Sequence, residues 1–162
     1  MTGGKRGAMV RPNVSVAVHV EGLRARPVAV REVRRRAERM LGTLGLQDHE
    51  LSVVLASDAV VRGLNREYRH IDRATDVLAF AMREGADARV TPTLLGDVVI
   101  SLDTAARQAR ARRVTLLDEV TVLLAHGLLH VVGFDHRDAR EARRMKARTD
   151  LLCEAAKLGR PR

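Results

Sequence analysis

Three histidines lie within an eleven-residue stretch and have the spacing needed to bind one metal ion. His126 and His130 are four residues apart in a segment of helical character, so both should project from one helix face, about 5–6 Å apart at Cβ. Gly133 can end that helix and reverse the chain, which would bring His136 back as a third ligand. Three protein ligands leave one position open on a tetrahedral zinc ion, as in catalytic zinc sites that activate water. The motif therefore predicts a metal-dependent hydrolase with one Zn²⁺ per chain.

The same histidine spacing occurs in metzincin peptidases, which carry a catalytic glutamate directly after the first histidine. Gly127 stands at that position here, which argues against proteolysis and leaves a zincin-like metallopeptidase as an alternative. Asp135, beside the third histidine, has three possible roles: to orient an imidazole, to join the metal or to cap the following helix. Met145 is expected in the core rather than in a peptidase-type Met-turn. The remaining histidines show no such grouping: His19, His49 and His70.

The composition indicates a basic single-domain protein with few aromatic side chains. The chain has 162 residues, and 29 Lys and Arg against 20 Asp and Glu give a net charge of +9. This charge would attract polyanions, and arginine suits bidentate phosphate contacts, although a GC-rich genome, with Arg replacing surface Lys, is an alternative explanation of the Arg-rich composition. Aromatic residues make up 2% of the chain, so single-stranded nucleic acid cannot be held mainly by base stacking. The one cysteine, Cys153, is expected to be a small buried side chain on a helix.

The two ends of the chain are interpreted separately from its central part. Residues 1–13 are interpreted as a flexible basic leader, 14–158 as a single metal-hydrolase domain and 159–162 as a tail. The leader lacks the apolar stretch of a signal peptide, and no apolar run reaches the roughly 18 residues of a membrane span. We therefore expect a cytoplasmic protein with no membrane partner.

Hydrophobic periodicity and turn residues predict an α+β domain, with a roughly four-stranded mixed or antiparallel sheet and about five helices. Strands are expected at residues 14–20, 50–57, 77–81 and 94–100. Helices are expected at residues 27–42, 58–68, 103–112, 115–132 and 138–158, with loops at 69–76 and 84–92. Asp58 and Ser101 are predicted helix caps. The last helix should turn these side chains inward: Ala142, Met145, Ala147, Leu151 and Leu152. The zinc site then lies on the fourth helix and the turn after it.

The histidine motif HGLLHVVGFDH, together with two further segments, resembles the YbeY family of bacterial endoribonucleases, also called ribosomal RNA maturation factors. The segment LNREYR at 64–69, followed by TDVLAF at 75–80, is similar to that family's central block. The segment LGDVVIS at 95–101 is similar to a characteristic strand of the family. Order and spacing agree from about residue 50 to 136. Ala79 stands where the family commonly has Ser, and Phe134 where it often has Tyr.

This resemblance implies a single-domain metal hydrolase that cleaves single-stranded RNA. It implies a role in processing the end of small-subunit ribosomal RNA and in ribosome quality control. RNA and the small ribosomal subunit are the implied partners, with ribosomal proteins and assembly GTPases as further candidates, and no DNA partner is expected. A non-catalytic ribosome assembly factor with a structural metal is the remaining alternative.

The resemblance also assigns residues. His126, His130 and His136 would be zinc ligands, and Arg69 would be the functionally important arginine. A fixed guanidinium near the metal would hold the scissile phosphate and stabilise charge developing on its oxygens. Asp76, either ordering its loop or anchoring Arg69, and Asp97, either supporting the metal ligands or purely structural, are further candidates.

Overall fold

The computed structural model describes residues 16–24, 28–82 and 93–157. The predicted leader, the tail at 159–162 and the loop at 84–92 lie outside these ranges. Within them, the chain folds into four strands and five helices, as the sequence patterns predict. No single helix in the described ranges has the length and apolar composition of a membrane span. The helices α3 (Leu102–Arg112) and α4 (Leu116–Val131), which pass that test only together, are bent by 115°.

The four strands form one mixed sheet, so the antiparallel alternative is wrong. The order is β1-β2-β4-β3, with β1, β2 and β4 parallel and β3 antiparallel to β4. Gly96 lets β3 pair closely with β4, because its φ is +150° and a Cβ there would lie 2.1 Å from the carbonyl oxygen of Phe80. The strands are β1 (Val16–Glu21), β2 (Glu50–Ala56), β3 (Val77–Ala81) and β4 (Leu94–Ser101).

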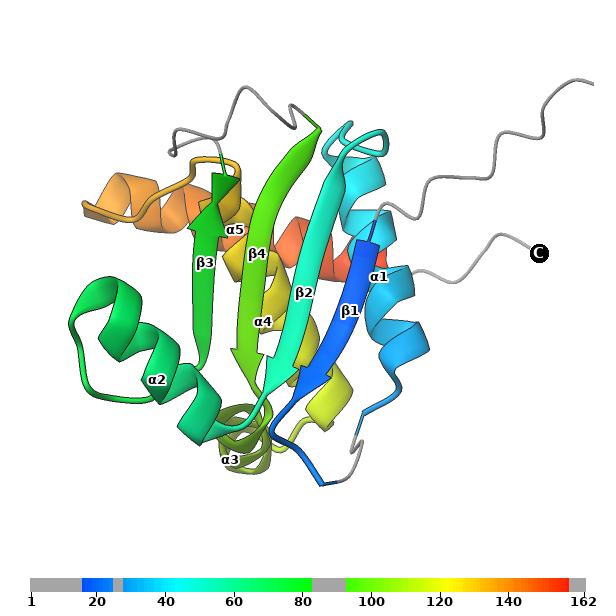
Figure 1. The fold of residues 1–162 in the computed structure, drawn as a ribbon. Helices are drawn as coiled ribbons and strands as arrows, with labels where there is room; N and C mark the ends of the chain where they lie inside the picture. The colour runs from blue at the N-terminus through cyan, green and yellow to red at the C-terminus, as the bar shows by residue number, and fades with distance from the viewer. Residues whose placement is uncertain (1–15, 25–27, 83–92, 158–162) are drawn as a thin grey trace, which may run out of the picture.

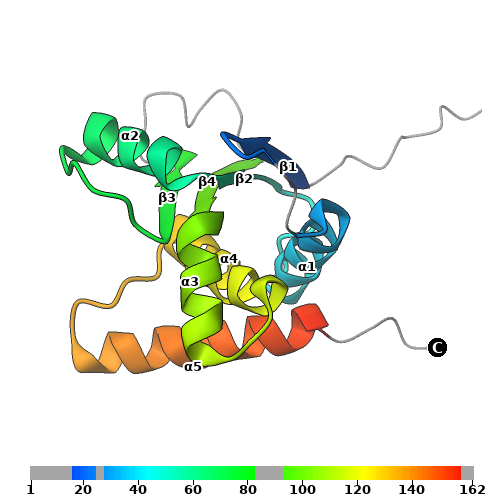
Figure 2. The same cartoon turned by 90° about the horizontal axis from the view of Figure 1, so that it is seen from below.

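The helices are unevenly divided between the two faces of the sheet (Figures 1 and 2). On one face α4 and α1 pack against the strands and α5 crosses beneath them, whereas α2 covers only the β3 side of the other face. The main core fills the first of these interfaces. The helices are α1 (Val30–Thr43), α2 (Asp58–Arg69), α3 (Leu102–Arg112), α4 (Leu116–Val131) and α5 (Ala139–Lys157).

Helix α4 is the central element, because apolar side chains surround it and it contacts the sheet and three other helices. Its apolar residues are not confined to one stripe, which is typical of a helix buried on several sides. Gly127 allows a close approach to the sheet, since a Cβ there would lie 2.6 Å from Cγ1 of Val98 and 3.1 Å from Cγ2 of Val77. The helix that carries two of the predicted ligands is thus pressed against β3 and β4.

The predicted cap of α2 is one residue off. Ser57, in extended conformation, is the N-cap, and its hydroxyl accepts a hydrogen bond from the backbone N–H of Val60. Asp58 instead accepts hydrogen bonds from Thr104 Oγ1 at 2.7 Å and Arg107 Nη2 at 2.8 Å, and thereby joins the starts of α2 and α3. Ser101 caps α3 as predicted.

The predicted inward face of α5 is partly wrong. Met145 and Leu152 are buried, and Cys153 is buried as expected, but Ala142, Ala147 and Leu151 are exposed. Thr149 takes an inward position instead, and its hydroxyl donates to the carbonyl of Met145 at 2.8 Å. A threonine whose hydroxyl is hydrogen-bonded within the helix can be buried at little cost. Apolar character alone therefore predicts the inward face of α5 incorrectly.

Candidate metal centre

The end of α4 and the turn after it bring the three predicted histidine ligands together. His126 and His130 lie one turn apart, with their Nε2 atoms separated by 3.2 Å. The helix ends at Val131, and Gly133, at φ +103°, reverses the chain. His136 returns to the cluster, with its ring centroid 5.8 Å from that of His126 and 5.3 Å from that of His130.

The three imidazoles fit a single metal ion. One ring nitrogen of each lies within 4.8 Å of the others, and no second group of this kind occurs in the described ranges. Zinc–nitrogen bonds of about 2.0–2.1 Å at tetrahedral angles place ligand nitrogens about 3.3 Å apart, close to the spacing of the α4 pair. The donor set therefore suits a divalent transition metal, and the fold preorganises two of its three ligands.

Burial favours the neutral form of the two helix-borne imidazoles. It lowers the pKa of His126 and His130 below the ordinary value. Coulombic repulsion from His130 and His136 lowers the pKa of His126 further, and repulsion from His136 lowers that of His130. Asp76 partly opposes this effect at His126, as Asp135 does at His130. Because a metal binds the neutral imidazole, the lowered pKa values favour metal binding over protonation at neutral pH.

His126 and His130 line a cavity of about 670 Å³ between α2, β3 and the α4–α5 turn. His126 and His130 are half-buried, whereas His136 is exposed, so solvent reaches the cluster from the side of the turn. Besides the α4 residues, the cavity is lined by Asn65, Arg69, Arg73, Thr75, Asp76, Ala79, Phe134, Asp135 and Arg137, among others.

Arg69 lines this cavity with His126 and His130, although it comes from the far end of α2. Its Nη2 donates a hydrogen bond to the carbonyl of Ala79 at 2.8 Å, and its guanidinium lies 5.5 Å from the centre of the Phe80 ring. These two contacts with β3 fix the guanidinium beside the cluster. The structure thus brings the family-implied arginine to the predicted metal ligands.

Asp76 lines the cavity as well, and its contacts show how it is held. One carboxylate oxygen accepts from the backbone N–H of Val77 at 2.8 Å, and the other accepts from Gln108 Nε2 at 3.2 Å. These bonds order the start of β3. Among the described residues no contact joins this carboxylate to Arg69, so the structure favours the loop-ordering role over the anchoring one.

Asp135 does not cap α5; Asp138 does, by accepting from the backbone N–H of Glu141 at 2.8 Å. Asp135 accepts from the backbone N–H of His136 and from Arg137 Nε, each at 2.8 Å. Its carboxylate also lies 3.9 Å from Nδ1 of His136. It therefore shapes the turn that presents the third histidine.

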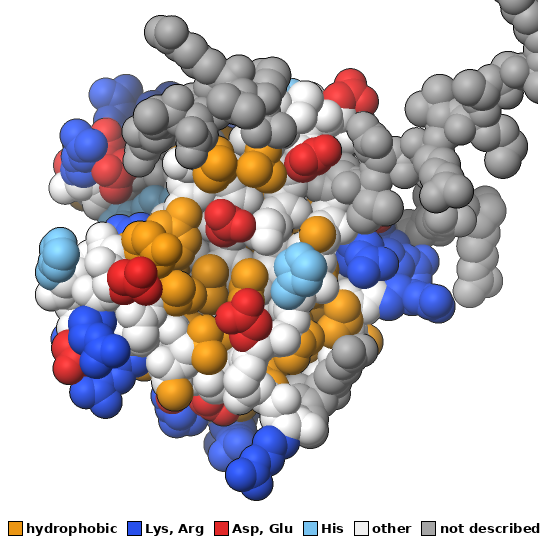
Figure 3. Space-filling view, viewed as in Figure 1, with side chains coloured by type: hydrophobic (Ala, Val, Ile, Leu, Met, Phe, Trp, Pro, Cys, Tyr) orange, Lys and Arg blue, Asp and Glu red, His pale blue; other side chains and the backbone are white. Residues whose placement is uncertain are grey.

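Asp97 is not brought to the histidines. Neighbouring strand residues face opposite sides of a sheet, and Val98 faces α4 at Gly127, so Asp97 faces the other side. There it lines a hollow with Glu21, Val54, Leu64, Tyr68, Phe80 and Val99. Figure 3 shows this open sheet face as apolar and acidic, with Lys and Arg gathered at its margins.

Three cavity features were not predicted from the sequence. Asn65 is 4% exposed, and its Nδ2 donates to the carbonyl of Arg73 at 2.8 Å, which ties the 70–76 loop to α2. Arg73 lines the cavity from that loop, and Gln108 holds Asp76 from α3. A signal for Asn65 was present, because it lies one helical turn from Val61 on the apolar side of α2.

A four-stranded mixed sheet is backed by a buried helix, and a three-histidine cluster that could hold a metal ion lies at the end of that helix and the turn after it. These features define the chain as an α+β protein with a candidate metal centre. The family described as Endoribonuclease YbeY matches residues 24–157, which is most of the chain. The chain belongs to the YbeY family.

Individual relatives agree with this assignment. The chain is 47% identical to Endoribonuclease YbeY of Geobacter metallireducens over 127 residues, covering 77% of this chain and 85% of the relative. It is 42% identical to that of Syntrophotalea carbinolica over 134 residues, covering 81% and 89%. The solution structure of TM1509 from Thermotoga maritima superposes with a TM-score of 0.60 at 21% identity, covering 86% and 89%, and shows a shared fold.

Proposed function

We propose that this protein is a single-strand-specific, zinc-dependent endoribonuclease that acts in 3′-end maturation of ribosomal RNA and in ribosome quality control. The observation that carries the proposal is that Arg69 lines the same cavity as His126 and His130, which cluster with His136, in a chain of the YbeY family. The curated relatives reported above are named endoribonucleases. The proposal includes a cytoplasmic site of action, with the small ribosomal subunit as substrate and with ribosomal proteins and assembly GTPases as candidate partners.

Zinc is the proposed metal, held by His126, His130 and His136, because three neutral imidazoles at this spacing match its usual ligands. When bound, it would supply Lewis-acid activation of water and of the phosphodiester. The histidine cluster is exposed on the side of His136, and a substrate phosphate and water can enter from that side.

Arg69 is the proposed phosphate-binding residue. A guanidinium has five N–H donors, and the structure shows one bond from this group, to the carbonyl of Ala79. Donors are therefore left for the scissile phosphate, whose negative charge grows during cleavage. Because β3 fixes the guanidinium beforehand, little reorganisation is needed when substrate binds.

No carboxylate in the described part of the cavity is free to act as a strong general base. Both oxygens of Asp76 accept hydrogen bonds, from Val77 and Gln108, and both oxygens of Asp135 do so within its own turn. We therefore expect modest turnover and tolerance of substrate sequence, since rate depends on the metal and on Arg69 rather than on a dedicated base.

The structure disfavours the peptidase alternative by a steric argument. A Cβ at position 127 would point at Val98 and Val77, so a glutamate there would have to displace the sheet contact. The backbone is thus built for glycine where metzincins need their base.

The decisive test is cleavage of single-stranded RNA by purified protein, with and without chelator, beside the His126→Ala variant. We expect metal-dependent cleavage that the variant lacks; equal cleavage by the variant would indicate a contaminating nuclease and overturn the assignment. Elemental analysis should find one zinc per chain, lost when all three histidines are replaced by alanine.

Two further arms address the alternatives. Metal-dependent digestion of casein without RNA cleavage would favour a peptidase. Normal complementation of ribosome maturation by a folded variant with all three histidines replaced would favour a non-catalytic assembly factor.

A further inference from the structure

A second hollow of about 340 Å³ adjoins the metal cavity on the side of α5. The two share Gly133, Phe134, Asp135 and Arg137, so the surface continues from the histidines over the α4–α5 turn. Glu141 and Arg144 of α5 complete the second hollow. A strand whose phosphate lies at the metal centre therefore has a continuous route towards α5.

A row of arginines continues this route along α5. Arg140, Arg144 and Arg148 are four residues apart, so they lie on one side of the helix at intervals of about 6 Å. All three are exposed, and none contacts a carboxylate in the part of the chain that the structure describes. Lys146, by contrast, is paired with Asp150. The row presents positive charge at regular spacing.

Phe134 links the row to the metal centre. Its half-buried ring lines both hollows, and the guanidinium of Arg148 lies 6.0 Å from the ring centre. Of the acidic groups of this region, Asp135 is paired with Arg137 Nε, whereas Glu141 and Asp138 accept only backbone N–H groups, from Arg137 and Glu141. The three arginines of the row outnumber these two carboxylates, so positive charge dominates the path from Phe134 outward.

The other large open surface is unsuitable for a polyanion. The uncovered sheet face carries Glu21 and Asp97 around apolar side chains, and Figure 3 shows Lys and Arg only at its margins. Repulsion by these carboxylates would direct an RNA strand away from that face.

We propose that the row Arg140–Arg144–Arg148 on α5 binds the backbone phosphates of the RNA strand on one side of the scissile bond. The inference rests on the proposed function, and it means that the RNA substrate extends from the metal centre along α5. Contacts of this kind hold the strand without reading its sequence, because arginine forks bind phosphate oxygens rather than base edges.

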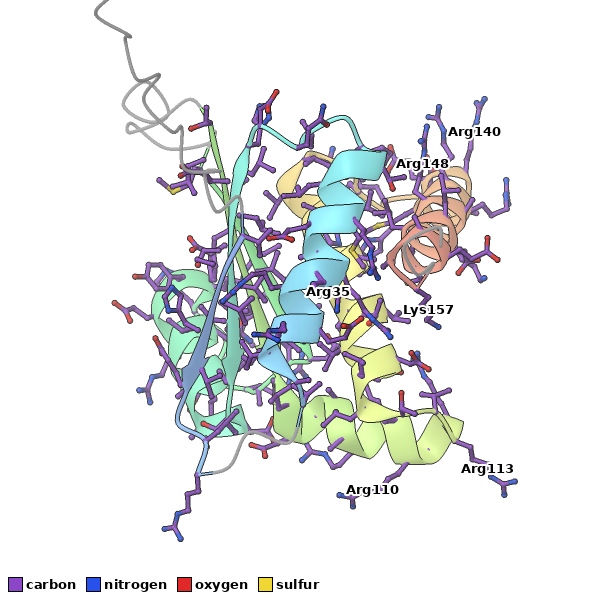
Figure 4. All side chains as sticks on the ribbon, turned by 90° about the vertical axis from the view of Figure 1, so that its right-hand side faces the viewer. Arg35, Arg110, Arg113, Arg140, Arg148 and Lys157 are labelled. Atoms are coloured by element: carbon purple, nitrogen blue, oxygen red, sulfur yellow. The ribbon has the colours of Figure 1, made fainter. Side chains whose placement is uncertain are left out.

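The test compares two double variants of the full chain. Arg144→Gln/Arg148→Gln removes two charges from the row, while Arg110→Gln/Arg113→Gln removes two exposed arginines from the end of α3. Figure 4 shows Arg110 and Arg113 at the opposite end of the molecule from Arg140 and Arg148. The control arginines also precede α4, a helix about 24 Å long, whose far end carries the histidines. Glutamine preserves helix propensity at the three helical positions, and Arg113 is the C-cap residue of α3.

Binding of a 20-nucleotide single-stranded RNA is measured over a range of salt concentrations, alongside zinc content and melting temperature. For the α5 pair we expect the slope of log K against log salt to become shallower by about 1.4, from two lost phosphate contacts. The ratio of KM for the 20-mer to KM for a dinucleotide should rise only in this variant. The control pair should retain the wild-type slope.

Equal salt-dependence slopes for the two double variants would overturn the proposal that the arginine row binds RNA. An equal rise in KM for the 20-mer and for the dinucleotide in the α5 variant would also overturn it. Wild-type protein that binds the 20-mer without cleaving it would contradict the proposed function. In that case the salt-dependence slopes would still show whether the arginine row binds RNA. Wild-type protein that does not bind RNA would overturn both proposals.

Discussion

His126 and His130 sit on a helix surrounded by the core, whereas His136 sits on an exposed turn between two helices. The first two side chains are placed by the packing of α4 against the sheet, and Gly127 sets the distance of that packing. The third is placed by Gly133 and by the local hydrogen bonds of Asp135. We call these the helix half and the turn half of the metal centre. The comparison teaches that a rigid pair can define a site while a looser third ligand completes it.

The largest expected difference is in metal binding and activity. His126→Ala should abolish zinc binding and reduce RNA cleavage by about a thousandfold, since the metal contributes several kcal/mol to the transition state. His136→Ala leaves the preorganised pair intact, so it should retain weaker zinc binding and residual cleavage. Zinc titration and initial rates measure both variants. Identical behaviour would show that the two halves contribute equally.

Gly127→Glu tests whether the helix half depends on contact with the sheet. The new side chain would meet Val98 and Val77, so we expect a loss of about 3 kcal/mol in the free energy of unfolding. The melting temperature should fall by about 6–12 °C. Thermal denaturation of metal-free protein measures this without interference from the site. A variant as stable as wild type would mean that position 127 faces the cavity and not the sheet.

Gly133→Ala tests the turn half, with Gly45→Ala as a matched control. Both glycines have positive φ, +103° and +71°, and neither has an atom within 4 Å of an added Cβ. Each substitution should therefore cost about 1 kcal/mol through backbone strain alone. Only Gly133→Ala should also weaken zinc binding, because only this turn presents His136. Equal zinc affinities in the two variants would show that the turn at Gly133 does not contribute to metal binding.

The smallest expected effect is a pH dependence that belongs to the helix half. The pKa values of His126 and His130 are lowered in the folded protein, mainly by burial, so the unfolded chain binds more protons below its ordinary pKa of about 6.5. The stability of metal-free protein should therefore be complete above that pH and decline as the pH falls through it. His126→Gln should make the decline shallower in urea denaturation series between pH 7 and pH 5. A steeper decline in the variant would contradict the assigned direction.

Much of this architecture can be predicted from the sequence, because the patterns that determine it are local. The periodicity of apolar residues predicts all four strands and all five helices of the described ranges, within a few residues at their ends. The clustering of the three histidines follows from two histidines at helical spacing and a glycine that permits reversal. Each of these signals lies within a dozen residues.

The sequence says less about which side of an element faces which neighbour. It left two roles open for Asp97, and this side chain faces the open side of the sheet because its orientation depends on where α4 packs and not on β4 itself. Thr149 lies on the inner side of α5, whereas Ala142, Ala147 and Leu151 are exposed. Alanine tolerates either environment, so the two alanines carry no signal of the side they face. Arg69 was singled out only through the family resemblance, since one arginine among many carries no local signal. Its place beside the histidines depends on the pairing of β3 with β4.

The burial of α4 has a consequence for how the protein exchanges its metal. Amide protons of a helix held within the main core exchange with solvent only when the whole domain opens, whereas those of an exposed turn exchange through small local excursions. Residues 133–138 should therefore take up deuterium long before Leu124 or Leu128. An ion would leave by first losing His136, while the remaining pair keeps its geometry, ready for the next ion to arrive.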